Sequence, residues 1–492
     1  MISDKKAFPK IDLKNEPSPS QNRDARLQKQ FNWDSLRHWG YIINGILGNL
    51  DSSVDEQFIN QDSKIKDLID RYKNQVIENT NNTEIVDARK PEGRPAFHDV
   101  GERLNKDIYS KANIDKALNY DPLEDGLVQD YNVPGAASAI QAFAKTIAAD
   151  KGVMKILFLT DIHSGKGTND AHFSANNPEK DYTDATPLSL AMLKNMNAFD
   201  GQIDCAIMNG DNIHGFEYEA NIIRNKQVVS TAHNVLTNTD LFVTLGNHDD
   251  GSVYSQDKND VLTREDLLDI CDFDAYSFGE TREDFAAYKD YPNYKIRVLS
   301  IAGFDNPDVF DENGVAKYPR GSHSVFRQDQ IDFIIKALQS LPNGYAVIVF
   351  NHSPLVGFFN NKPYTADYDI NHDVVNGIFQ AFANKATYTG QGINADFPAS
   401  AEVDFSGANG SLIGIIAGHE HRDQPVQEVN GVKSVTRAAF VAADRGTDKT
   451  KTTKEMLGTL EQYAFDVIEI DTQNRKVNFK RFGIGDDYSY EY

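Results

Sequence analysis

Five apolar runs of strand length are each followed, within a few residues, by side chains that bind metal ions. The runs cover residues 154–160, 206–209, 241–245, 346–350 and 413–417. Apolar residues occupy both faces of each run, which is typical of strands buried on two sides by other layers. The pattern therefore predicts an α/β protein. Residues 296–301 are a further predicted strand, but no metal-binding side chains follow it.

The residues after these runs offer four imidazoles, two carboxylates and one amide oxygen. They are Asp161, His163, Asp211, Asn247, His352, His419 and His421. In α/β sheets, sites form at the carboxyl ends of the strands. Each block alone is a weak signal, because short motifs often occur by chance. Together they suit two divalent transition ions (Mn, Fe, Zn or Ni) and neither calcium nor a thiolate site.

Two such ions, about 3.5–4 Å apart, clamp a phosphate and hold a bridging hydroxide that attacks phosphorus in line. An adjacent imidazole then protonates the departing alkoxide, and we assign that role to His248. Asp249 is either its orienting partner or a plain loop carboxylate. His214 and Arg422 are candidate substrate contacts; the alternatives are a surface loop histidine and a surface salt bridge.

The blocks D-x-H, G-D-x, G-N-H-D, a later H and G-H-x-H stand in the order of the calcineurin-like metallophosphoesterases. The sequence resembles that family over residues 150–485. The resemblance implies a four-layer sandwich of two mixed β-sheets flanked by helices, with His248 as the catalytic imidazole. It also implies the ligand sets: Asp161, His163 and His421 for the first metal, Asn247, His352 and His419 for the second, and Asp211 bridging both.

Two further elements resemble parts of that family's fold. Residues 324–338 look like the helix that precedes the strand of the fourth ligand block. Residues 464–471 and 476–483 look like the family's closing hairpin. The resemblance therefore extends beyond the ligand blocks to the C-terminal part of the chain.

The N-terminal part has a different composition. Residues 1–50 form a polar arm with Trp33 and Trp39, a pair that either docks against a partner or belongs to a local core. Residues 51–82 are helical, with Phe58, Ile65 and Tyr72 spaced by seven, so they form either a trimeric coiled coil or a solvated surface helix.

A junction follows in residues 83–150, and the enzymatic domain in 151–492. The segments 83–89 (TEIVDAR) and 94–104 resemble the junction of tail-fibre and baseplate proteins of phages that infect Gram-positive bacteria. In those proteins the junction separates a trimeric helical shoulder from a receptor-binding or enzymatic module. This resemblance implies a homotrimer that contacts other tail proteins.

Composition excludes several classes of function. The chain of 492 residues has 73 acidic and 50 basic side chains, a net charge of −23, which argues against general nucleic-acid binding. No run approaches the roughly 18 apolar residues that span a bilayer, and the N-terminus shows no signal peptide. Cys205 and Cys271 are expected to be buried thiols.

These observations lead to one hypothesis and two alternatives. The hypothesis is a phage tail or baseplate enzyme, carried on the virion to the host cell surface, that hydrolyses the phosphodiesters of teichoic acid. One alternative is a cytoplasmic phosphodiesterase or phosphatase that acts on nucleotides or phosphoproteins. The other is a structural or receptor-binding tail protein whose phosphoesterase domain binds without hydrolysing. In each case, loops 249–290 and 357–399 are expected to shape the pocket.

Overall fold

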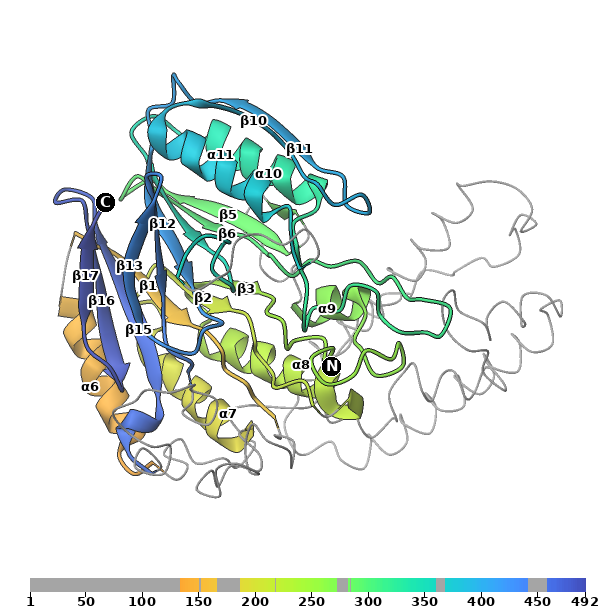
Figure 1. The fold of residues 1–492 in the computed structure, drawn as a ribbon. Coiled ribbons are helices and arrows are strands. Elements are labelled where there is room, and N and C mark those ends of the chain that lie inside the picture. The colour runs from red at the N-terminus through yellow and green to blue at the C-terminus, as the bar shows by residue number, and fades with distance from the viewer. Residues whose placement is uncertain are drawn as a thin grey trace, which may run out of the picture. The chain divides into compact units, whose positions relative to one another are not determined.

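The computed structural model describes residues 133–149, 152–165, 186–216, 218–271, 282–283, 285–359, 368–440 and 458–492 (Figure 1). All of them belong to the compact unit Arg89–Tyr492. The predicted N-terminal arm with Trp33 and Trp39, the predicted coiled coil and most of the junction lie outside the described residues.

One mixed sheet has six strands in the order β17-β16-β15-β1-β2-β3. The strands are β1 (Met154–Leu159), β2 (Cys205–Asn209), β3 (Asp240–Thr244), β15 (Ala464–Asp471), β16 (Lys476–Gly483) and β17 (Tyr488–Glu491). β1, β2 and β3 are parallel to one another, and β15, β16 and β17 are added in antiparallel pairings. The predicted closing hairpin is confirmed as β15 and β16.

The second mixed sheet has seven strands in the order β13-β14-β12-β8-β6-β5-β4. They are β4 (Arg282–Glu283), β5 (Ala286–Tyr291), β6 (Ile296–Ser300), β8 (Ala346–Phe350), β12 (Ser411–Ala417), β13 (Gln424–Val429) and β14 (Val432–Thr436). Its centre is parallel, from β6 through β8 and β12 to β14. Two short pairs complete the strands: β7 (Ser324–Val325) with β9 (Asp369–Ile370), and β10 (Thr387–Gln391) with β11 (Ser400–Asp404).

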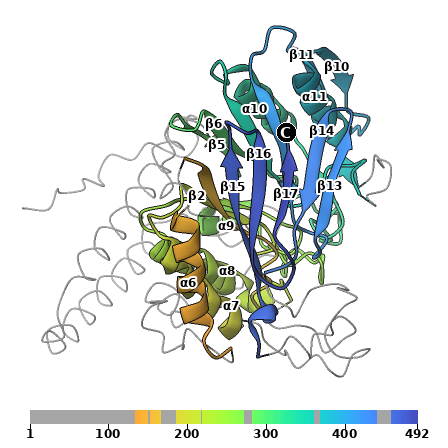
Figure 2. The same cartoon turned by 90° about the vertical axis from the view of Figure 1, so that its left-hand side faces the viewer.

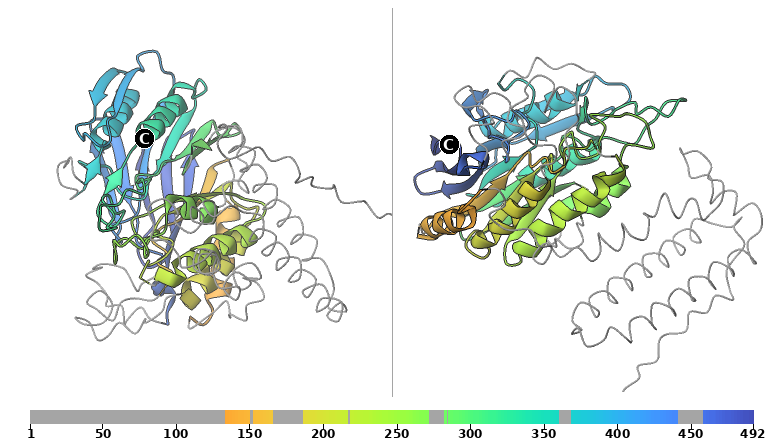
Figure 3. Two further views of the ribbon diagram at one scale, coloured as in Figure 1. Left: turned by 90° about the vertical axis from the view of Figure 1, so that its right-hand side faces the viewer. Right: turned by 90° about the horizontal axis from the view of Figure 1, so that it is seen from below.

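Helices cover the outer faces of the two sheets (Figures 1 and 2). They are α6 (Ala136–Ala149), α7 (Thr186–Asn195), α8 (Tyr218–Val235), α9 (Arg264–Cys271), α10 (Gln328–Gln339) and α11 (His372–Asn384), with two 3-10 turns at Met196–Phe199 and Leu460–Gln462. α6, α7 and α8 lie against the six-stranded sheet, and α10 and α11 lie against the seven-stranded one (Figure 3).

Side-chain alternation along β1 shows how the layers are held together. Met154, Ile156 and Phe158 enter the apolar core between the two sheets, whereas Leu157 and Leu159 enter the core beneath the helices. Every residue of β1 is buried, and five of its six side chains are apolar. The predicted four-layer α/β sandwich is confirmed.

One predicted boundary is wrong. We expected a helix over 324–338, but Ser324 and Val325 form β7, and α10 begins at Gln328. The backbone amides of Ser324 and Phe326 donate to the carbonyls of Tyr368 and Ile370, so pairing with residues 368–370 holds this segment extended.

Two other expectations concern burial and membranes. Cys205 and Cys271 are buried free thiols, as predicted. No helix in the part of the chain that the structure describes has the length and apolarity needed to cross a membrane.

Candidate metal centre

The predicted ligands follow the carboxyl ends of β1, β2, β3, β8 and β12. The loops after β1 and β2 stay in register, because the amides of Asp161 and His163 donate to the carbonyls of Gly210 and Asp211 at 3.1 and 2.9 Å. On the other sheet, the amide of Gly418 donates to the carbonyl of His352 at 2.9 Å. The extended pairing of the strands therefore positions the loops that carry the ligands.

Several ligands occupy a backbone region that L-residues rarely adopt. The φ angles are 54° at Asp161, 47° at His163, 52° at Asp211, 67° at His419 and 53° at His421. Such left-handed conformations cost on the order of 1–3 kcal/mol each and concentrate at functional sites. Here each one turns a ligand side chain directly off the end of a buried strand.

Among the described residues, two groups of potential ligand atoms share one carboxylate, and a third joins His163 to His214 and His248. The first group contains Asp161, His163, Asp211 and His421, and the second contains Asp211, His352 and His419; within each group the ligand atoms lie within 4.8 Å of one another. Nε2 of His163 lies 3.0 Å from Nε2 of His421, and Nε2 of His352 lies 3.1 Å from Oδ2 of Asp211.

Asn247 belongs beside the second group. Its Oδ1 lies 2.9 Å from Nδ1 of His419, and its side chain is almost buried. All seven predicted ligands are thus brought together, and Asp211 belongs to both groups.

The two carboxylates of the centre are stabilised by positive charge nearby. Asp161 and Asp211 are both buried, and two buried carboxylates are costly without positive charge nearby. Burial opposes the ionisation of Asp211, but His352 and His248 hold the pKa of that carboxyl well below its usual range. Burial likewise disfavours the charged form of His352, yet Asp211 and Asp161 raise its pKa to about 9.

Two of the other imidazoles have the protonation state that metal binding needs. Burial, together with the charges of His248 and His421, holds the pKa of His163 well below its usual range. Burial and His352 lower the pKa of His419 to about 4. Both rings are therefore neutral at pH 7, with a lone pair available for an ion.

His352 gives the most direct test of whether metal ions fit. Its Nδ1 donates to the carbonyl of Asn209 at 2.7 Å, which directs Nε2 toward the two carboxylates. No described residue makes a well-directed hydrogen bond to this fully buried Nε2. A divalent ion satisfies such an atom, and the mixed His, Asp and Asn donors suit two divalent transition ions.

His248 lies beside the first ligand group. Its backbone amide donates to Oδ1 of Asp211 at 2.8 Å, and its ring packs edge-on against the ring of His163 at 4.7 Å. Nδ1 lies 2.8 Å from the carbonyl oxygen of His214. Because a carbonyl can only accept, Nδ1 carries the proton, and Nε2 is left as the nitrogen that exchanges protons.

The structure contradicts Asp249 as the orienting partner of His248 and leaves the alternative, a loop carboxylate. The carboxylate of Asp249 accepts hydrogen bonds from the backbone amides of Gly246 (2.7 Å), Asn212 (2.7 Å) and Asp211 (3.1 Å), and the group that holds the ring of His248 is the carbonyl of His214. A buried carboxylate needs donors, and the loops after β2 and β3 supply them. Burial, with the charge of Asp211, raises the pKa of Asp249 to about 7. Asp249 therefore ties the two loops together.

The two candidate substrate contacts differ in their surroundings. His214 is buried, its Nε2 lies 2.5 Å from the hydroxyl of Tyr254, and its carbonyl orients His248, so it is not a surface histidine. The side chain of Arg422 is half-exposed, and its guanidinium forms an ion pair with Glu420 at 2.5 Å. The surface salt bridge that we gave as the alternative for Arg422 is what the structure contains.

Sequence reasoning missed groups that act through the backbone or across long separations. The carbonyls of Asn209 and His214 orient two site imidazoles, and a carbonyl has no sequence signature. Asp250 accepts from the buried guanidinium of Arg320 at 3.1 Å, although the two are 70 residues apart. Tyr254, whose hydroxyl contacts His214, was also missed. Its position in the loop 249–290, which we expected to shape the pocket, was the one sequence feature that pointed to it.

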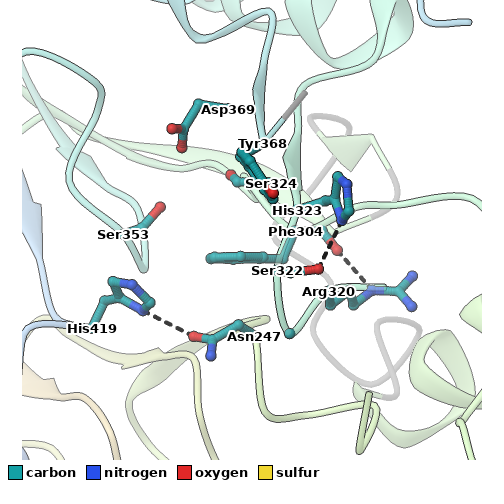
Figure 4. Close-up of a pocket in the computed structure, with 11 residues that line it drawn as sticks. Asn247, Phe304, Arg320, Ser322, His323, Ser324, Ser353, Tyr368, Asp369 and His419 are labelled. Atoms are coloured by element: carbon teal, nitrogen blue, oxygen red, sulfur yellow. Dashed lines mark hydrogen bonds between the residues drawn. The ribbon is translucent and has the colours of Figure 1, made fainter. Parts of the chain in front are cut away.

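A cavity of about 130 Å³ opens beside the second ligand group (Figure 4). Asn247 and His419 line one end of it, and the ring of Phe304 lies along its floor. The rest of the wall comes from residues 320–324, Ser353 and residues 368–369. The cavity is therefore continuous with the proposed metal centre.

The comparisons with known proteins come from sequence and from structure. Residues 154–423 match the family model described as calcineurin-like phosphoesterase. No curated protein matches the chain.

Three solved structures are similar to the chain. A dimetal phosphatase from Danio rerio is 13% identical with a TM-score of 0.45, and the match covers 69% of this chain and 99% of that one. A protein serine/threonine phosphatase from Saccharomyces cerevisiae is 13% identical with a TM-score of 0.25, covering 77% and 97%. A 5′-nucleotidase from Candida albicans is 12% identical with a TM-score of 0.29, covering 65% and 52%.

Proposed function

Since this chain belongs to the calcineurin-like phosphoesterase family and is a metal-dependent phosphoester hydrolase, we propose that its substrates are phosphodiesters and that His248 is the proton donor. The observation that carries this proposal is the pair of ligand groups joined by Asp211, with the ring of His248 packed directly against them. The cavity beside the second group supports a diester, because it offers space for a second substituent on phosphorus.

The residues divide the work as follows. Asp161, His163 and His421 would hold one ion, Asn247, His352 and His419 the other, and Asp211 both. When bound, two divalent ions neutralise the charge of the phosphate and make a water molecule acidic enough to attack phosphorus.

His248 handles the leaving group. Its Nδ1 proton is fixed on the carbonyl of His214, so Nε2 is the nitrogen from which a proton would pass to the departing alkoxide.

The biological substrate is proposed from the N-terminal sequence. We propose a homotrimeric phage tail or baseplate enzyme that acts on glycerol- or ribitol-phosphate teichoic acid at the surface of a Gram-positive host. Support comes from the resemblance of segments 83–89 and 94–104 to tail-protein junctions and from the heptad spacing of Phe58, Ile65 and Tyr72. Attachment to other tail proteins would then run through the N-terminal region.

The test uses the full chain, stripped of metal with a chelator and reloaded with manganese. Hydrolysis is measured with bis-p-nitrophenyl phosphate, p-nitrophenyl phosphate, cAMP and purified teichoic acid. We expect turnover of the diester above that of the monoester, no turnover after metal removal, and release of glycerol or ribitol phosphate from teichoic acid.

Each other outcome has a definite meaning. A preference for the monoester contradicts the diester proposal, and hydrolysis of cAMP without action on teichoic acid favours the nucleotide alternative. If the chain holds two ions and hydrolyses none of the four esters, two proposals are contradicted: His248 as the proton donor and phosphodiesters as the substrates.

A further inference from the structure

The cavity beside the second ligand group contains one carboxylate that the proposed chemistry does not use. Asp369 lies at the start of β9, where pairing with Ser324 of β7 fixes its backbone. Its side chain lines the cavity opposite Asn247 and His419 (Figure 4). No described residue forms an ion pair or hydrogen bond with this half-buried carboxylate, and burial raises its pKa.

The neighbouring guanidinium does not neutralise Asp369. Arg320 donates to the carbonyls of Phe304 at 2.8 Å and Asn306 at 2.6 Å, and to Asp250 at 3.1 Å. Figure 4 shows its guanidinium turned away from the centre of the cavity. The carboxylate therefore gives this wall of the cavity a negative charge.

Aromatic rings lie between the carboxylate and the metal ligands. Phe304 is buried along the floor, and Tyr368 is 53% exposed at the rim, with its ring 5.4 Å from that of His323 at an interplanar angle of 31°. Aromatic faces combined with a carboxylate attract organic cations, because the ring quadrupole and the anionic oxygen both favour positive charge.

A phosphodiester has two arms on phosphorus, the alcohol that leaves and the substituent that is retained. The position of the proton donor decides which of the two enters the cavity. His248 packs on His163 in the first ligand group, whereas the cavity is lined by Asn247 and His419 of the second. The alcohol that leaves must be near His248 to receive its proton. The cavity is therefore placed to receive the substituent that stays on phosphorus.

We propose that this cavity binds a positively charged nitrogen, such as a quaternary or primary ammonium, on the retained arm of the phosphodiester. Asp369 supplies the counter-charge, and Phe304 and Tyr368 supply the aromatic faces. The inference rests on the proposed phosphodiesterase function and names a class of substrate for it.

The test compares two chromogenic diesters that differ only in charge. p-Nitrophenyl phosphocholine carries a trimethylammonium group, and p-nitrophenyl 3,3-dimethylbutyl phosphate carries the neutral tert-butyl group of the same shape. With the manganese-loaded full chain we expect kcat/KM to favour the cationic ester about tenfold, the size of one charge-assisted contact. The preference should disappear in Asp369→Asn and persist in Glu402→Gln, which removes an exposed charge on β11 outside the cavity.

A second measurement does not depend on turnover. Choline alone should bind weakly to the metal-free chain in saturation-transfer NMR, and Asp369→Asn should remove the signal. Equal kcat/KM for the two esters in the unmodified chain, an undiminished preference in Asp369→Asn, or no choline signal would overturn the inference. If neither ester releases nitrophenolate while choline still binds, the phosphodiesterase proposal fails and the cation site stands.

Discussion

At the scale of the residue, His248 makes the sharpest chemical prediction. It lies outside the two ligand groups that share Asp211, so His248→Ala should lower kcat by about 10²–10⁴ without changing the metal content measured by mass spectrometry. The loss should be larger for a diester with an alkyl alcohol leaving group than for one with nitrophenol, which leaves without a proton.

Two results would contradict that assignment. An equal loss for both leaving groups would indicate a structural role for His248, and full activity would exclude any role. His233→Ala, at the end of α8 and away from the site, serves as the control and should keep the unmodified rate.

A second residue-scale prediction concerns stability and pH. His372 is buried at the start of α11, its Nε2 lies 2.7 Å from Oγ of Ser324, and burial lowers its pKa to about 3. Its ordinary value is about 6.5, so the unfolded chain takes up this proton before the folded chain does. The contribution to stability is therefore complete above pH 6.5 and is lost as the pH falls toward 3.

The expected loss is about 3 kcal/mol between pH 7 and pH 4.5, from the pKa difference between the folded and unfolded states. Urea unfolding at the two pH values measures it, with His372→Gln as the comparison because glutamine does not titrate. The unmodified chain should lose about that much more free energy of unfolding than the variant. The same pH dependence in both would show that His372 does not set it.

At the scale of the element, the close approach of β2, β3 and β8 sets the geometry of the second ion site. Gly210, between β2 and Asp211, has φ +86°, and an added Cβ would lie 2.6 Å from the amide nitrogen of Gly246 and 2.7 Å from Nδ1 of His352. Gly210→Ala should therefore displace His352 and lose bound metal together with activity.

The control for this prediction is a glycine with a similar positive φ angle and open space where a Cβ would be added. Gly152 has φ +82°, and nothing lies within 4 Å of an added Cβ, so Gly152→Ala should cost about 1 kcal/mol of stability and keep both ions. Metal-to-protein ratios after gel filtration measure the outcome. If Gly210→Ala retained two ions, the prediction would be wrong. The ends of β2, β3 and β8 would then accommodate the added Cβ without displacing His352.

At the scale of the whole molecule, the prediction concerns assembly. If the heptads of residues 51–82 hold three chains together, light scattering of the full chain should give three times its 55.0 kDa. Ile65→Asp places a charge in the seam and should yield monomers that hydrolyse bis-p-nitrophenyl phosphate at the same rate per chain. Ser63→Asp adds the same charge outside the seam and should stay trimeric, whereas a monomeric unmodified chain would remove the assembly proposal.

The net charge of −23 also acts on the whole molecule. It repels a polyanionic substrate at long range, but screening confines that repulsion to about 8–10 Å in ordinary salt. At the site itself, two bound divalent ions would be the largest local charges and would dominate the attraction of phosphate. The acidic composition therefore argues against a general nucleic-acid surface, and it does not prevent the site from binding a phosphate ester.

The sequence by itself determined the strands and the ligand blocks. A strand buried on both faces is mostly apolar, and polar side chains commonly follow its end. Asp161, Asp211 and His352 could therefore be identified as site residues from their positions within two residues of the ends of such runs. The closing hairpin and the four layers followed from the family that the order of these blocks resembles.

Only the tertiary structure decided how those residues are oriented and what surrounds them. The carbonyl of His214 holds His248, and Asp249 binds backbone amides, because hydrogen bonds to the main chain depend on how loops approach one another. The cavity joins Asn247, Phe304 and Asp369, which come from distant parts of the chain. A pattern along the sequence carries local periodicity, whereas a pocket is made by residues that only folding brings together.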